Sequence, residues 1–92
     1  MLLFTHPAML AHEPPPGHAE RVERLQSVLD ALEGLALDRR EAPLAPREAI
    51  ERVHPANYVD ALEPAFTEAR ATRVRLDPDT YISAGSREAI YR

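Results

Sequence analysis

The sequence contains no cysteine, no lysine and no long hydrophobic run. Without cysteine, disulfides, thiolate metal sites and a cysteine nucleophile are all excluded. The apolar start, residues 1–10, is too short to span a membrane and lacks the basic region of a signal peptide. We therefore expect a cytoplasmic protein. The absence of lysine beside abundant alanine, arginine and proline is typical of a GC-rich bacterial genome.

Charge and apolar content limit the class of protein further. The chain has 15 acidic and 11 basic residues and no basic block, so electrostatic binding of nucleic acid is not expected. Leucine, isoleucine, valine and phenylalanine supply only 21 of its 92 residues, which is just above the share at which chains stay disordered. A chain of this length makes one small domain at most and buries only about 60 to 65% of its unfolded surface. We expect modest stability.

The clearest structural signal is an amphipathic helix predicted over residues 18–33. Apolar residues recur there at steps of three and four, which puts them on one helix face that needs a core. Gly34 follows at the position where a left-handed C-cap is cheapest. The residues of this face are Val22, Leu25, Val28, Leu29 and Leu32.

The remaining segments predict a mostly α-helical chain with one or two short strands. Residues 2–5 form a short apolar run typical of a buried strand of a parallel sheet. Residues 7–17 contain four prolines and are expected to be a stiff loop at a rim. Prolines divide residues 46–71 into broken helices, with Pro64 predicted to separate the helix before it from one more pair of turns at residues 65–71. A final helix is predicted from about residue 85.

Four histidines, His6, His12, His18 and His54, suggest a metal site. The first three are six residues apart, which suits no usual pair of helical ligands, so structural, hydrogen-bonded histidines are the favoured interpretation. No Ser-His-Asp order and no glycine-rich phosphate loop is present.

Asp77 and Asp79 flank Pro78 and allow two interpretations. They are either a carboxylate pair or cation site, or part of an Asx turn or helix cap. Spacing alone favours the turn or cap.

Four segments together resemble one protein family. Gly17–Leu25, GHAERVERL, resembles the GHPERPERL signature near the start of histone deacetylases and acetylpolyamine amidohydrolases, with Ala19 and Val22 in place of its prolines. His12 precedes this segment as in the family. The other two segments are Val53–Val59, VHPANYV, similar to the family's VHxxxYV, and Leu76–Ser83, LDPDTYIS, similar to its LDxDTxxS.

This resemblance implies a three-layer α/β/α fold with a central parallel sheet and a zinc-dependent amidohydrolase that cleaves acetyl-lysine, acetylpolyamine or similar amides. The family's zinc ligands, catalytic histidines and oxyanion tyrosine all fall beyond residue 92. We therefore expect residues 1–92 to be an N-terminal segment with no catalytic and no metal-binding residue, inactive alone, with zinc bound only in the full-length enzyme.

The resemblance also implies secondary roles for three residues of this chain. Asp79 matches a rim aspartate that accepts hydrogen bonds from the substrate backbone, His18 would border the active-site mouth, and Arg24 matches an arginine lining a channel for acetate release. The structural alternatives are that Asp79 caps the turn before Thr80, that Arg24 pairs with Glu20, and that His18 anchors the loop to the first helix.

Helix faces shaped to meet a missing sheet would be left exposed, and exposed apolar patches find partners. The expected partner is either the missing catalytic part or a second copy, in a homo-oligomer such as a dimer with exchanged helices or strands. A free-standing helical module that binds another protein is the alternative. A small metal-dependent hydrolase that uses the loop histidines is a third hypothesis.

Overall fold

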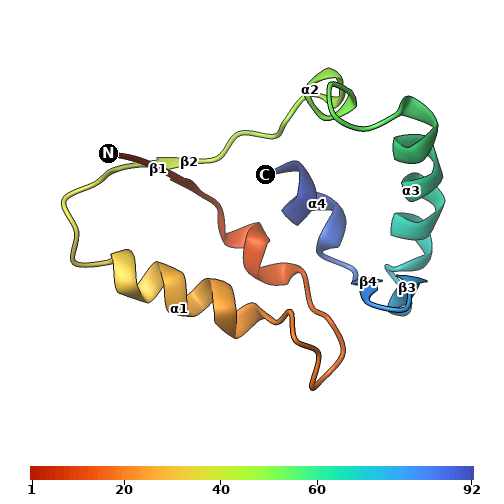
Figure 1. Cartoon of the computed structure of the whole chain (residues 1–92), viewed down its shortest axis with the longest axis horizontal. Helices are drawn as coiled ribbons and strands as arrows, with labels where there is room; N and C mark the ends of the chain where they lie inside the picture. The colour runs from red at the N-terminus through yellow and green to blue at the C-terminus, as the bar shows by residue number, and fades with distance from the viewer.

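The computed structural model describes all 92 residues and is mixed α/β, with four α-helices and four short strands (Figure 1). In chain order the elements are β1 (Leu2–Thr5), the 3-10 helix η1 (Pro7–Ala11), α1 (Val22–Leu32), β2 (Asp38–Glu41), α2 (Arg47–Glu51), α3 (Ala56–Glu68), β3 (Val74–Asp77), β4 (Thr80–Ile82) and α4 (Ser86–Tyr91). The strands are more numerous than the sequence predicts.

The predicted strand at residues 2–5 is confirmed, and it pairs in parallel with β2. The register runs from Leu2 opposite Asp38 to Thr5 opposite Glu41. A parallel pair needs a long crossover connection, and η1 and α1 supply it here. The two strands form a sheet of their own, without a third strand.

The predicted rim loop 7–17 is wrong in its first half, because Pro7–Ala11 form η1. Pro7 fixes the backbone at the first helical position, where its missing N–H costs nothing. The His6 side chain caps the turn, because its Nδ1 accepts the Ala8 N–H at 3.0 Å. Residues 12–17 are irregular and contain Gly17 at a φ of 81°, which favours glycine.

The predicted amphipathic helix is present as α1, but it begins at Val22 and not at residue 18. Arg21 is extended, with a φ of −161°, and the His18 ring holds the preceding turn by hydrogen bonds. The left-handed cap predicted at Gly34 is also wrong, since Gly17 is the one residue with positive φ. The Arg39 guanidinium instead donates to the carbonyl of Leu32, the last residue of the helix, and to those of Glu33 and Leu35 just after it.

The broken helices predicted over 46–71 are present as α2 and α3, although Pro64 does not interrupt α3. The helix continues because Val59 and Phe66, on either side of Pro64, are buried, and their packing outweighs one lost hydrogen bond. Arg47 ties α2 to α3 through its ion pair with Asp60, and it also pairs with Glu51 of its own helix.

The C-terminal part consists of the antiparallel pair β3 and β4 followed by α4. Val74 lies opposite Ile82 and Arg75 opposite Tyr81, with an irregularity before Asp77 and Thr80. The final helix predicted from about residue 85 is confirmed, since α4 begins at Ser86.

Burial is sparse for a chain of this length. Only six of the 92 residues are buried, and the core is a cluster of Phe66, Ala69 and Ile82. The Cα radius of gyration is 14.6 Å, compared with about 12 Å for a compact domain of this size. Figure 1 shows the cause: β1, β2 and α1 lie on one side, and α2, α3, β3 and β4 on the other, with α4 between them.

No helix has both the length and the apolar composition that a membrane span requires.

Candidate functional site

The turn between β3 and β4, residues Asp77 to Thr80, is held by its own side chains. The Asp77 Oδ1 accepts the N–H of Asp79 at 2.8 Å, which is the Asx turn favoured by the spacing. Hydrogen bonds from the Asp79 N–H and the Thr80 hydroxyl hold the pKa of Asp77 below its ordinary value of 3.8. The Arg75 guanidinium donates to the carbonyls of Asp77 at 3.1 Å and Pro78 at 3.4 Å.

Asp79 itself presents a free carboxylate at this turn. The residue is exposed, and its side chain makes no hydrogen bond or ion pair within the chain. Asp77, and not Asp79, therefore provides the cap before Thr80.

His18 joins the first part of the chain to this turn. Its Nε2 lies 3.0 Å from the backbone oxygen of Asp79, and its Nδ1 accepts the Glu20 N–H at 3.2 Å. The ring also stands edge-on to Tyr81, with centroids 5.6 Å apart and an interplanar angle of 79°. His18 thus anchors the loop to the β3–β4 turn across 61 residues of sequence.

A second polar cluster consists of His12, Ser83 and Ser86 and lies where β4 leads into α4. Ser86 is fully buried; its Oγ lies 2.7 Å from the His12 Nδ1 and accepts the Ser83 N–H at 2.7 Å. The Ser83 Oγ donates to the Ala11 carbonyl at 3.2 Å and accepts the Glu13 N–H at 2.9 Å. This network closes η1 and its following loop onto the start of α4.

The network includes a serine, a histidine and, more distantly, a carboxylate, since the His12 Nε2 lies 4.0 Å from a Glu20 carboxylate oxygen. A nucleophile must reach its substrate, and Ser86 has no exposed surface. The cluster is therefore structural. Sequence reasoning missed it because His12 and Ser86 are 74 residues apart.

Arg24 lies away from both clusters, on the exposed surface of α1. Its side chain makes no hydrogen bond or ion pair, so the predicted pairing with Glu20 is not formed, and Glu20 faces His12 instead. Arg24 borders a shallow hollow together with Glu20, Arg21, Leu25 and Val28.

The four histidines are dispersed. No group of three or more side chains of histidine, aspartate or glutamate is placed to hold a metal ion. Each histidine has its own contact within the chain: His6 with Glu41 at 3.3 Å, His12 with Ser86, His18 with Asp79, and His54 with the carbonyl of Ile50 at 3.1 Å.

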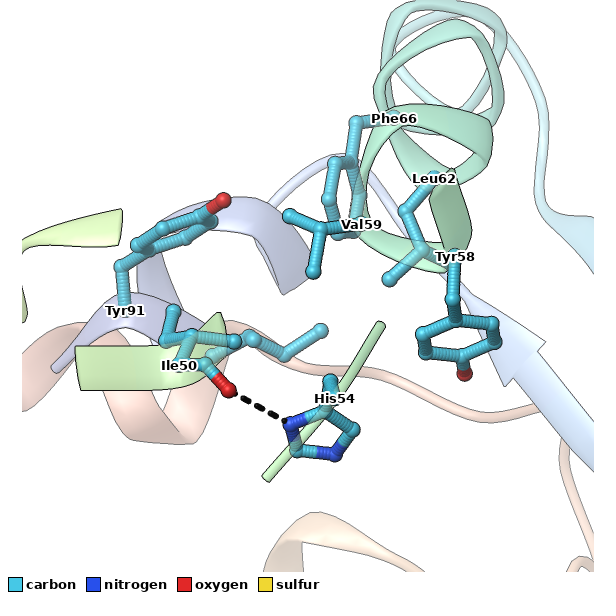
Figure 2. A pocket seen from close by; sticks show the side chains of 8 residues that line it. Ile50, His54, Tyr58, Val59, Leu62, Phe66 and Tyr91 are labelled. Carbon is cyan, nitrogen blue, oxygen red and sulfur yellow. Dashed lines mark hydrogen bonds between the residues drawn. The ribbon is translucent and has the colours of Figure 1, made fainter. Parts of the chain in front are cut away.

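An apolar groove of about 160 Å³ lies between α2, α3 and α4. Figure 2 shows Val59, Leu62 and Phe66 projecting from α3 into it, with Tyr91 of α4 opposite. Arg87 holds α4 across the groove through Glu63, at 3.1 and 3.2 Å. The other lining residues are Ile50, His54, Tyr58 and Ile90.

Comparison of the chain with protein-family models gave no match, and comparison with curated proteins gave no significant match either. The resemblance to the deacetylase family therefore rests on the motif residues of the sequence itself.

Proposed function

We propose that this chain is the N-terminal segment of a zinc-dependent deacetylase-like amidohydrolase. The observation that carries the proposal is that the other three family-like segments all lie against Leu76–Ser83 or the residues just after it. His18, in Gly17–Leu25, bonds Asp79 at 3.0 Å. The loop around His12 bonds Ser83 and Ser86. Tyr58, in Val53–Val59, shares a hollow with Leu76, Asp77 and Thr80.

The two-stranded parallel sheet supports the same proposal. Parallel strands occur in α/β proteins with helices over both faces, yet Leu2 is 48% exposed and Phe4 49% exposed in β1. In the proposed full protein, β1 lies within a larger parallel sheet of a three-layer α/β/α fold. The helices of this segment cover one edge of that sheet.

Within this proposal the chain shapes the rim and not the catalytic centre. The exposed Asp79 carboxylate accepts hydrogen bonds from the substrate backbone, His18 borders the mouth, and Arg24 lines the channel for acetate. The zinc ion activates water for attack on the amide. The part of the enzyme after this segment holds the zinc ion and also supplies the catalytic histidines. The substrate is acetyl-lysine, acetylpolyamine or a similar amide.

The genomic DNA downstream of codon 92 tests the proposal. We expect an open reading frame there, either in the same frame as this chain or shifted from it, that encodes a His-His pair and an Asp-x-His segment. The isolated 92-residue chain is expected to release no acetate from an acetyl-lysine peptide, with or without added zinc, because it cannot assemble a ligand set. Deacetylation by the purified chain with one equivalent of zinc would contradict the proposal and favour the small hydrolase.

A second candidate function, a self-assembling helical module, is favoured by the exposed apolar side chains. Val28 of α1 is 54% exposed and belongs to the stripe predicted to need a core. In size-exclusion chromatography with light scattering, we expect the isolated chain to self-associate at micromolar concentration. Val28→Glu should weaken the association, while Ser27→Glu, which adds the same charge beside the stripe, should not.

A monomer throughout the micromolar range would contradict self-association. If that monomer also melted in a single cooperative transition, the chain would be a free-standing domain. A helical module that binds another protein would then replace the proposed deacetylase segment.

A further inference from the structure

The backbone of Asp79 is fixed from both sides by side chains. Its N–H donates to the Asp77 carboxylate at 2.8 Å, and its carbonyl oxygen lies 3.0 Å from the Nε2 of His18. The second bond comes from a residue 61 positions away in the chain, so the turn cannot rotate without breaking one of the two bonds. Asp79 is thus held at one place relative to the loop before α1.

The rest of the turn is held as well. Arg75 donates to the carbonyls of Asp77 and Pro78. Of the two aspartates in the turn, Asp77 is used as the Asx acceptor, while the Asp79 carboxylate makes no hydrogen bond or ion pair in the chain. A turn fixed at its backbone therefore presents the free Asp79 carboxylate to solvent.

We propose that His18 is a positioning residue that sets the Asp79 carboxylate as an acceptor for the backbone N–H groups of an acetyl-lysine peptide; this inference rests on the proposed function for its ligand. A group held in its binding geometry loses less conformational entropy when the ligand binds. His18 contributes through the Asp79 backbone and does not contact the peptide.

The hydrogen bonds define which nitrogen of His18 carries the proton. Nε2 faces the Asp79 carbonyl, which can only accept, so the neutral ring has its proton on Nε2; Nδ1, at 3.2 Å from both the N–H and the carbonyl oxygen of Glu20, then accepts the N–H. Nitrogen NMR of the ring at neutral pH should therefore show one tautomer, with the proton on Nε2. His54, which faces the carbonyl of Ile50 through Nδ1, should show the opposite tautomer and serves as the internal reference.

Binding is measured on the full 92-residue chain with a capped Gly-acetyllysine-Gly tripeptide, by NMR titration of the backbone amide signal of residue 79 in every variant. Asp79→Asn should weaken binding about tenfold, since a charged acceptor is lost. His18→Ala should weaken it about fivefold, because the carboxylate is released from its position. His18→Gln, whose amide N–H can replace Nε2–H, should stay within about twofold. His54→Ala is the matched control and should leave affinity unchanged.

Each outcome separates the two proposals. If Asp79→Asn weakens binding but His18→Ala does not, the positioning role is wrong and the rim function stands. If Asp79→Asn binds as well as the unaltered chain, or if the unaltered chain binds no tripeptide, the rim function fails and the positioning role fails with it. A mixture of ring tautomers in His18, or failure of His18→Gln to restore binding, also overturns the positioning role.

Discussion

Gly85→Ala is expected to lower the free energy of unfolding by about 3 kcal/mol, because of the three glycines only this one has atoms in the way of an added Cβ. A Cβ built on Gly85 would lie 2.5 Å from the Cβ of Ala11, 2.9 Å from its carbonyl carbon and closer still to its carbonyl oxygen. All three atoms belong to the body of η1 and not to the end of a flexible side chain. The backbone of Gly85 has a negative φ of −88° with a ψ of −5°, a conformation that is allowed for alanine, so the main cost is steric.

Gly34→Ala is the matched control for this prediction. No atom lies within 4 Å of a Cβ placed there, and the residue does not have a positive φ. The same substitution at Gly34 should leave stability unchanged or raise it by up to about 1 kcal/mol, because it restricts the unfolded chain. Urea unfolding followed by far-ultraviolet circular dichroism compares the two variants. Equal unfolding midpoints would show that η1 and α4 are not in contact in solution.

The elements that the sequence predicts well are those whose own residues determine them. The stripe of α1 repeats at helical spacing, the apolar run of β1 is typical of a parallel strand, and α4 follows a polar, glycine-containing start. Strand β2 could not be predicted in this way. Its sequence, DRRE, has no apolar alternation and all four residues are exposed, so only its pairing with β1 makes it a strand.

Errors at helix ends come from contacts that sequence spacing does not contain. The start of α1 is delayed to Val22 because His18 bonds Asp79, which follows 61 residues later. The end of α1 is capped by Arg39 and not by Gly34. Pro64 stays inside α3 because Val59 and Phe66 are buried on either side of it. In each case a tertiary contact outweighs a local preference.

In the candidate site, too, the residues can be selected from the sequence, but the contacts between them cannot. Motif resemblance selects Asp79, His18 and Arg24 from the sequence, but it does not predict that His18 bonds the backbone of Asp79. It also gives no indication that Asp77 supplies the cap while the Asp79 carboxylate stays free. The spacing of the two aspartates allows either of them to form the turn, and only the hydrogen bonds distinguish the two roles.

Ser86→Ala is expected to lower the free energy of unfolding by about 2 kcal/mol, because it leaves two polar groups without a partner. The Ser86 Oγ is fully buried and is bonded by the Ser83 N–H and the His12 ring, both at 2.7 Å. Water cannot replace the hydroxyl without opening the contact between η1 and α4. Ser27→Ala removes a hydroxyl whose bond to the Glu23 carbonyl is also 2.7 Å but exposed, and it should cost less than about 0.5 kcal/mol.

The double variant tests whether His12 and Ser86 act as one unit. If they do, His12→Ala and Ser86→Ala together should destabilise the chain by about 1 kcal/mol less than the sum of the single changes, since the second removal takes away a group already left unpaired. Urea unfolding of the four proteins gives this coupling energy. Strict additivity would mean that His12 and Ser86 are not bonded in solution. It would contradict the interpretation that these two residues close the first loop onto α4.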